Sequence, residues 1–327
     1  MDTNEVKSLS IIVAYHNEPR LFIQKCIDQI LDTIDVPEWE IIVVDDASYR
    51  PLAPIYGTTI IRHPDNRGVG AAFDTGVKAA KYQNVMLLGC DTRFIANNWT
   101  SKMVDEIENN PKALTCTLCV KLGRSELNER FATDITNQLQ TKKYGLGATI
   151  KMLSSGSIID AQWLPLNGST EHTPSYEVPC ILGAAYGVKK SWYQYIDGFN
   201  GHKKWGTLEP LISLKSWMFG GSCRVAPGIQ IGHIFNLTNK HNVHSGYRYY
   251  NKFMVATMFI PGYERYMQHY NREGVPKKAG KIIQETMPWL MEKKKEYTPK
   301  ITMTFDEFCR KFNINNTISN EKNISLS

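Results

Sequence analysis

Hydrophobic residues in the first hundred positions form short runs separated by amphipathic stretches. The runs at 9–15, 40–45 and 85–89 are dominated by apolar residues, as expected for strands that are covered on both faces of a sheet. Between them, apolar residues recur at helical spacing over 19–34 and 69–82. The alternation predicts a βαβαβ-type series built on a mostly parallel sheet.

After residue 100 the pattern is less regular, but it still predicts helices and strands. The expected helices occupy 100–110, 125–140, 190–196, 210–221 and 247–259, and the expected strands occupy 113–122, 223–228 and 229–235. Basic helices are expected after residue 260, and an Asn- and Ser-rich tail from about 313 is expected to be frayed.

The composition is that of a globular protein with a sizeable core. Hydrophobic residues make up 42% of the 327 positions and charged residues 21%, with both signs mixed, which excludes disordered and fibrous proteins. The net charge of +6 permits an anionic partner, but the lysines at 276–281 and 291–297 also fit a solvated helix face. Seven cysteines include one close pair, Cys116 and Cys119, without a second pair at zinc-ligand spacing, so reduced structural thiols are expected.

The N-terminal segment has no long apolar stretch. Its continuous apolar run over 11–15 is too short for a signal peptide or for a membrane-spanning helix, which needs roughly 20 such residues. A cytoplasmic protein is therefore expected.

Acidic side chains follow the early strands, at the edge where ligands bind in open parallel sheets. A short further strand is expected at 58–62, which makes the run at 85–89 the fourth strand. Glu18 follows the first strand, Asp45 and Asp46 end the second, and Asp91 follows the fourth. Acids at this edge suit a nucleotide, because its base and ribose donate hydrogen bonds. Each acid alone is also explained as a helix cap or first-turn residue, but their succession favours a nucleotide site.

A glycine-rich turn at 66–76 leads into the second helix. Gly68, Gly70 and Gly76 do not follow the first strand, so a dinucleotide-binding fingerprint fits poorly. Close packing of this helix beneath the nucleotide is expected instead.

Several motifs in a fixed order resemble the GT-A glycosyltransferases of family 2. They are "LSIIVAYHNE", "IIVVDDAS", "NRGVGAAFDTG" and a strand that ends in an acid. The later "WGTLEPLISLKSWMFGGSCRVAPGIQIGHIF" is similar to the polypeptide N-acetylgalactosaminyltransferase pattern of Trp-Gly-Gly-Glu-Asn, Trp-x-x-Gly-Gly and Gly-His-Val-Phe. The motifs span roughly residues 8 to 260, which makes the resemblance informative about fold and reaction class.

The resemblance implies a nucleotide-sugar donor, expected to be a UDP-sugar, held through Mn²⁺ or Mg²⁺. It places Asp91 and His233 at the metal, with Gly89 where the family has the first acid of an Asp-x-Asp or Asp-x-His triplet. A second register makes 91–93 the triplet, with Arg93 in the histidine position. Because Asp91 is the single acid in either register, diphosphate oxygens and water are expected to complete the coordination.

The same resemblance makes Glu209 the candidate base that deprotonates the acceptor hydroxyl, although Leu208 occupies the family's usual Glu position. Taking Pro210 as the first helical residue makes Glu209 the N-cap, where the helix dipole favours the charged carboxylate. A stabilising cap is the alternative to catalysis.

The remaining site residues are assigned from the same motifs. The expected nucleotide contacts are Ala14, Tyr15, Glu18, Asp45, Asp46, Asn66, Gly70 and Asp74. Gly183, Ala184 and Trp205 are expected near the donor sugar or the acceptor. His241, His244 and Arg248 are candidates for a lid over the diphosphate, although histidines in a polar loop are also explained by solvation.

These features together predict an α/β protein with the GT-A (nucleotide-diphospho-sugar transferase) fold, in which helices flank a mixed central sheet. The expected parts are a nucleotide-binding half (1–105), an acceptor and metal half (106–260) and a basic helical C-terminal extension (261–327). The expected function is metal-dependent transfer of a sugar to a hydroxyl of a cytoplasmic glycan or other macromolecule, with either stereochemical outcome open.

Two alternatives accompany this expectation. One is a phage-type DNA glycosyltransferase acting on hydroxymethyl pyrimidines, whose basic C-terminal third contacts phosphates. The other is a nucleotide-sugar-binding module without catalysis, in which Gly89 and the altered "WGTLEP" reflect lost activity.

Overall fold

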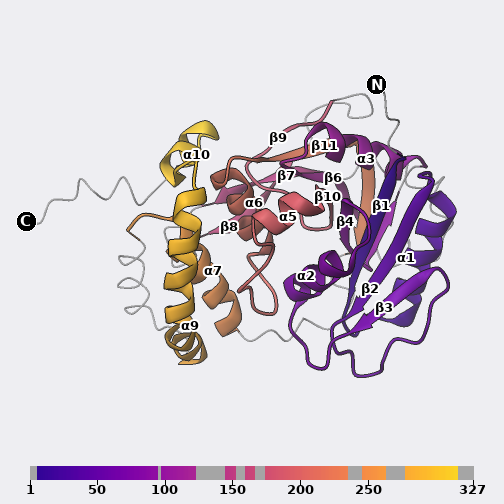
Figure 1. Ribbon diagram of the computed structural model, residues 1–327, viewed down its shortest axis with the longest axis horizontal. Coiled ribbons are helices and arrows are strands. Elements are labelled where there is room, and N and C mark those ends of the chain that lie inside the picture. The colour runs from indigo at the N-terminus through magenta and orange to yellow at the C-terminus, as the bar shows by residue number, and fades with distance from the viewer. Residues whose placement is uncertain are drawn as a thin grey trace, which may run out of the picture.

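The computed structural model describes residues 6–94, 97–122, 144–151, 159–165, 174–234, 245–262 and 277–315. Within them, helices flank one mixed sheet, which confirms the predicted α/β class (Figure 1). The expected helix at 125–140, the candidate lid residues His241 and His244, and the tail beyond 315 lie outside the described residues.

Within the described residues, one sheet of eleven strands runs through both predicted halves of the chain. Its main path is β3-β2-β1-β4-β10-β6-β11-β5, and β7 pairs with β6, β8 with β7, and β9 with β11. The strands are β1 (Ser8–Tyr15), β2 (Glu38–Asp45), β3 (Thr58–Arg62), β4 (Asn84–Gly89), β5 (Thr92–Phe94), β6 (Ala113–Leu122), β7 (Tyr144–Lys151), β8 (Asp160–Pro165), β9 (Tyr176–Glu177), β10 (Ala185–Lys189) and β11 (Ser222–Ile234). The first four strands are parallel, as predicted, whereas β10 is antiparallel to both of its neighbours.

Helices pack on the sheet and on one another. They are α1 (Arg20–Thr33), α2 (Val69–Ala79), α3 (Trp99–Asn109), α5 (Lys190–Tyr195), α6 (Leu208–Met218), α7 (Ser245–Phe259), α9 (Lys277–Tyr297) and α10 (Phe305–Lys311), with a short 3₁₀ turn at Thr298–Lys300. α9 lies beside α7, on the side of the molecule away from α1 (Figure 1). Among the helices that the structure describes, none combines the length and the apolar character needed to span a bilayer.

Tight packing of α2 on β1 accounts for one of the predicted glycines. A Cβ on Gly76 would lie 2.2 Å from Ile12 Cγ2, so the helix approaches the strand this closely only because residue 76 has no side chain. Asp46, which follows β2, accepts a hydrogen bond from the backbone N–H of Gly68 just before α2. The start of α2 is thereby held at the edge of the sheet that carries the predicted nucleotide site.

The two strands predicted at 223–228 and 229–235 form a single strand, β11. The pairing of β11 with β6 shifts between Ala226 and Gln230, so Pro227 and Gly228 lie in a bulge and not in a turn. The strand therefore continues along β6 to Ile234. This continuation brings its last residues opposite β5, which directly follows Asp91.

The C-terminal helices pack through aromatic rings and one ionic cluster. The ring of Tyr297 lies 5.2 Å from that of Phe219. Tyr297 also donates through its hydroxyl to Asp197 Oδ2 over 2.7 Å, and Lys293 Nζ lies 3.0 Å from the same oxygen. The predicted C-terminal extension is thus anchored to the second half of the chain.

Candidate active site

Strand pairing brings together the predicted metal ligands Asp91 and His233. β5 begins directly after Asp91 and runs antiparallel to β11, with Thr92 opposite His233. The backbone N–H of Ile234 donates to the carbonyl oxygen of Asp91 over 3.1 Å. As a result, Asp91 Oδ2 lies 3.3 Å from His233 Nε2, although the two residues are far apart in the sequence.

Asp91 and His233 stabilise each other's charged forms. Burial by itself raises the pKa of Asp91, but attraction to His233 outweighs burial and the net pKa is lowered. Burial likewise lowers the pKa of His233, but the neighbouring Asp91 reverses this and the net pKa is raised. A cation bound between the two side chains would replace the histidine proton.

The geometry of the pair fits two adjacent ligands of a hard divalent cation. Two ligand atoms at roughly 2.1 Å from a metal and at right angles to each other are about 3 Å apart, close to the observed 3.3 Å. Among the described residues, no group of three or more His, Cys, Asp or Glu side chains is arranged to hold a metal ion. Asp91 and His233 are therefore the candidate ligands in the described part of the protein, and completion of the coordination by diphosphate oxygens and water stays a prediction.

Gly89 and Arg93, which depart from the family's metal motif, have separate structural explanations. A Cβ on Gly89 would lie 2.6 Å from Asp91 Oδ1, so a side chain at position 89 would displace the Asp91 carboxylate. Arg93 is fully buried and donates to three backbone carbonyl oxygens, one of which belongs to Phe22 of α1. In the second register, the third position of the triplet therefore holds Arg93, a buried cation beside Asp91 and not a metal ligand.

Glu209 reaches the same region from the start of α6. The predicted N-cap position of Glu209 is wrong, because the helix begins at Leu208 and Thr207 is the N-cap, in the left-handed conformation with φ 64°. Glu209 is a first-turn residue, followed by Pro210, which is tolerated there because first-turn N–H groups have no partner inside the helix. A Cβ on Gly183 would lie 2.2 Å from Glu209 Oε1, so the carboxylate lies directly against this backbone.

Burial raises the pKa of Glu209, an effect that its own backbone N–H and His233 only partly oppose. The influence of His233 shows that Glu209 lies within electrostatic reach of the Asp91–His233 pair. Next to Gly183, the carbonyl oxygen of Ala184 accepts a hydrogen bond from Thr92 Oγ1 over 3.1 Å. Gly183 and Ala184 therefore lie between Glu209 and β5, where the sequence predicts the donor sugar.

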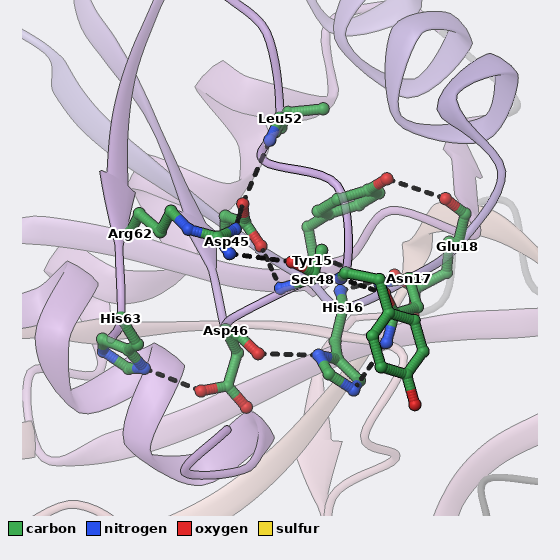
Figure 2. Close-up of polar contacts among 11 residues, drawn as sticks. Tyr15, His16, Asn17, Glu18, Asp45, Asp46, Ser48, Leu52, Arg62 and His63 are labelled. Carbon is green, nitrogen blue, oxygen red and sulfur yellow. Dashed lines mark hydrogen bonds and ion pairs between the residues drawn. The ribbon is translucent and has the colours of Figure 1, made fainter. Parts of the chain in front are cut away.

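Asp45 lies at the predicted nucleotide edge, but its carboxylate is buried and holds a loop (Figure 2). It accepts hydrogen bonds from the backbone N–H groups of Ser48 and Leu52 over 2.9 and 3.1 Å, and it forms an ion pair with Arg62. Although burial opposes the charge, these donors lower the pKa of Asp45 overall. Its contact with a nucleotide stays a prediction.

Asp46 is also buried and holds the glycine-rich turn. Its carboxylate accepts from the N–H groups of Arg67 and Gly68 over 2.8 and 2.7 Å. It also lies 2.7 Å from His63 Nδ1 (Figure 2). Gly68 in turn meets the backbone of Lys204, with which it forms a parallel bridge. Asp46 thereby connects the edge of β2 to the 203–206 segment.

His16 is a residue of this edge that the sequence analysis missed. Its Nδ1 lies 2.6 Å from the carbonyl oxygen of Asp46, which assigns Nδ1 as the donor, and its Nε2 lies 2.9 Å from Asn66 Nδ2. Asn66, a predicted nucleotide contact, accepts from Lys204 Nζ through its Oδ1 over 2.8 Å. The signal for His16 was its place after β1, in the same "AYHNE" stretch that contains Glu18.

The other predicted residues of β1 surround Glu18. Ala14 pairs with Gly89 of β4, and Tyr15 donates through its hydroxyl to the carbonyl oxygen of Glu18 over 2.8 Å (Figure 2). Burial raises the pKa of Glu18 to about 7, and repulsion from Asp91 contributes to the shift. Glu18 therefore lies toward the Asp91–His233 pair, and its contact with a nucleotide stays a prediction.

Gly70 and Asp74 of α2 make internal contacts. A Cβ on Gly70 would lie 2.9 Å from Phe199 Cβ. Asp74 accepts from the hydroxyl of Tyr193 over 2.7 Å and from the backbone N–H of Phe199 over 2.9 Å. These contacts agree with the expected close packing of the helix, whereas a direct nucleotide contact of either residue stays a prediction.

Trp205, in the turn before α6, packs against Arg248 of α7. The Trp205 side chain is 38% exposed, and the Arg248 guanidinium carbon lies 4.3 Å from the centre of its ring. Asn251 of α7, which is fully buried, accepts from the N–H of Lys203 over 3.0 Å and donates to the carbonyl oxygen of Gly206 over 3.1 Å. The helix that carries the predicted lid residue Arg248 therefore also fixes the turn that carries the predicted acceptor residue Trp205.

His202, at the start of this turn, should make the stability of the fold depend on pH. It is buried, with Nε2 2.8 Å from the carbonyl oxygen of Gly206, and burial lowers its pKa to about 4. The unfolded chain binds the proton near pH 6.5, so stability is full above this pH and falls as the pH drops from 6.5 toward 4. We expect wild type to lose about 2 kcal/mol more than His202→Gln between about pH 8 and pH 5.

Urea denaturation of both proteins at each pH measures this difference. Equal loss of unfolding free energy in wild type and His202→Gln would show that His202 is not held neutral in the folded state.

Comparisons with known proteins show what the chain is similar to in sequence and in fold. Residues 10–163 match the family described as Glycosyl transferase family 2. Polypeptide N-acetylgalactosaminyltransferase 4 of Caenorhabditis elegans is 21% identical over 253 residues, which cover 72% of this chain and 40% of the relative. Polypeptide N-acetylgalactosaminyltransferase 16 of Homo sapiens is 21% identical over 297 residues, which cover 86% of this chain and 50% of the relative. The chain thus spans half or less of the length of these curated relatives.

A solved structure supports the fold over almost the whole chain. The crystal structure of GalNAc-T7 with UDP, GalNAc and Mn²⁺ is similar with a TM-score of 0.71 over 94% of this chain and 57% of that chain, at 18% sequence identity. This similarity confirms the predicted GT-A fold. The chain is therefore similar to Glycosyl transferase family 2 over residues 10–163, and its helices and mixed sheet form the GT-A fold.

Proposed function

We propose that the chain transfers a sugar from a UDP-sugar to an acceptor hydroxyl, with a divalent cation held by Asp91 and His233. The observation that carries the proposal is the 3.3 Å approach of Asp91 Oδ2 to His233 Nε2, beside the contact of Glu209 with Gly183. The family match supports the reaction class. The GalNAc-T7 structure, which contains UDP, GalNAc and Mn²⁺, supports the donor and the metal.

Each residue has a distinct part in this proposal. The cation, when bound, neutralises charge on the diphosphate as the bond to the sugar breaks. Asp91 and His233 fix its position, and their buried surroundings strengthen the electrostatic interaction. Glu209 orients the acceptor hydroxyl and takes up its proton, since the raised pKa of this carboxylate makes it a better base than an exposed one.

The role of Glu209 is tested by Glu209→Gln. We expect the rate of UDP-sugar hydrolysis or transfer to fall about 100-fold, because the amide keeps the shape of the side chain but accepts no proton. The activity of wild type should rise with pH as Glu209 ionises, and this rise should be absent in the variant. UDP affinity, measured by calorimetry, should change little.

Glu285→Gln, an exposed position on α9, is the matched control and should retain wild-type activity. A Glu209→Gln variant with wild-type turnover and an unchanged pH profile would leave Glu209 as a first-turn structural residue only.

The proposed function as a whole is tested with a panel of UDP-sugars and Mn²⁺. Release of UDP from at least one donor, lost when the metal is chelated, is the expected result. No turnover with any donor, together with unchanged UDP binding in Asp91→Ala, would favour the nucleotide-sugar-binding module without catalysis.

A further inference from the structure

Four cations and the rings of Trp205 and Tyr247 form one surface, which we call the basic rim. It consists of Lys203, Lys204, Trp205, Tyr247, Arg248 and Lys278. The Arg248 guanidinium carbon lies 4.3 Å from the centre of the Trp205 ring, and Lys278 Nζ lies 4.6 Å from that of Tyr247. Lys204 Nζ lies 6.0 Å from the Tyr247 ring, and Lys203 Nζ lies 5.5 Å from the ring of Tyr250, also on α7. Residues from the 203–205 turn, α7 and α9 thus meet at one place, in agreement with the neighbouring positions of α7 and α9 in Figure 1.

In the part of the chain that the structure describes, the charges of the basic rim are not neutralised by neighbouring acids. Within the described residues, no carboxylate lies within 4.0 Å of the cationic groups of Lys203, Lys204, Arg248 or Lys278. Other lysines near α9 behave differently, since Lys293 pairs with both Asp197 and Glu296. Among the described residues, the rim therefore keeps a net positive charge, because none of its four cations forms an ion pair with a carboxylate.

The basic rim also adjoins the proposed catalytic residues. Lys204 Nζ contacts Asn66 Oδ1 at 2.8 Å, and Asn66 contacts His16 at the nucleotide edge. At the other end, the chain runs from Trp205 through the N-cap Thr207 directly into Glu209. A molecule bound along the rim would thus lie next to Glu209, on the side where we place the acceptor hydroxyl.

We propose that the basic rim binds a single-stranded or locally unpaired nucleic acid as the acceptor, an inference that rests on the proposed glycosyltransferase function. The cations contact phosphates, and the partly exposed ring of Trp205 contacts a base. Cations interleaved with aromatic rings are the combination by which proteins hold single strands without reading their sequence. A neutral glycan or an uncharged peptide would leave the four cations of the rim without counter-charges, whereas a phosphodiester chain supplies one at each nucleotide.

The first test is the salt dependence of binding, measured by fluorescence anisotropy with a labelled oligothymidylate of about twelve nucleotides and the full chain. Four phosphate contacts predict a slope of log K against log salt of about −2.8 for a single strand. Affinity should then fall about 50-fold between 50 and 200 mM salt. Absence of binding at 50 mM salt would overturn the proposal.

The second test removes charge at two positions. Lys203→Ala with Lys278→Ala should reduce the slope to about −1.4 and weaken binding at 50 mM salt. The matched control is Lys102→Ala with Lys112→Ala, which removes the same charge from exposed positions. Lys112 precedes β6 at the end of the strands opposite His233, because Ala113 pairs with Ser222 and Lys121 with His233. Equal losses in both double variants would mean that binding follows net charge and not the rim.

The third test separates a nucleic acid from other polyanions. Trp205→Ala should weaken oligothymidylate binding about tenfold, because one base loses its stacking partner, but it should not weaken binding of dextran sulfate. Equal effects on the two polymers, or dextran sulfate binding as tight as that of the oligonucleotide, would overturn the assignment to nucleic acid. UDP release from UDP-sugars in the absence of any polymer tests the proposed function separately, so the two proposals fail by different measurements.

Discussion

Asp91→Asn is expected to lower UDP-sugar turnover about 1,000-fold, or about 4 kcal/mol of transition-state stabilisation. The amide keeps the size of the side chain, so the strand pairing that holds residue 91 opposite β11 should survive. It removes the negative charge, and His233 Nε2, 3.3 Å away, then faces a neutral group. The cation would lose Asp91, the one acidic ligand that the described turn between β4 and β5 offers, and the affinity for the cation should fall with the turnover.

Two measurements check this expectation. Turnover is followed by UDP release, and Mn²⁺ binding by electron paramagnetic resonance of the free ion, which does not depend on activity. Asp105→Asn is the control, since Asp105 is an exposed α3 residue whose ion pair is with Lys7. Wild-type Mn²⁺ affinity in Asp91→Asn would show that the metal is not held by this carboxylate.

Gly68→Ala is expected to destabilise the fold by at least about 3 kcal/mol. Gly68 has φ +97°, and a Cβ there would lie 2.3 Å from the carbonyl oxygen and 2.4 Å from the Cα of Lys204. These are backbone atoms of a segment that Asn251 holds in place, so they cannot move aside as the end of a flexible side chain does. The unfolding free energy is measured by urea denaturation.

Gly262→Ala separates conformational strain from steric contact. Gly262 also has a positive φ, +76°, but a Cβ there would meet no atom of the described residues within 4 Å. Gly262→Ala should therefore lower the unfolding free energy by only about 1 kcal/mol, which is the strain of the left-handed conformation alone. Equal costs at the two positions would show that the approach of Gly68 to Lys204 is not rigid.

Local signals were sufficient for the first half of the sheet. The apolar runs of β1, β2 and β4 and the helical spacing of α1 and α2 depend on residues close in sequence, so their order and the strand-end positions of Glu18, Asp45 and Asp91 followed from the pattern. The motif order also predicted the GT-A fold, which the similarity to GalNAc-T7 confirms.

The sequence was less informative where an element depends on a distant partner. Pro227 and Gly228 read as the end of a strand, but β6 holds the backbone on both sides of them and the strand continues through a bulge. The start of α6 was placed too late, because the left-handed conformation of Thr207 arises in a turn held by α7 and is not encoded by Pro210.

What the sequence by itself determined is the order of elements and which polar residues end the strands, since both depend on short-range periodicity. Only the tertiary structure decided what those residues face. Asp45 and Asp46 turn inward to satisfy backbone N–H groups that would otherwise be buried without partners. Asp91 instead meets His233, as the family resemblance implied, because β11 passes its bulge and pairs with β5. The two residues are too far apart in the chain for a local pattern to specify this contact.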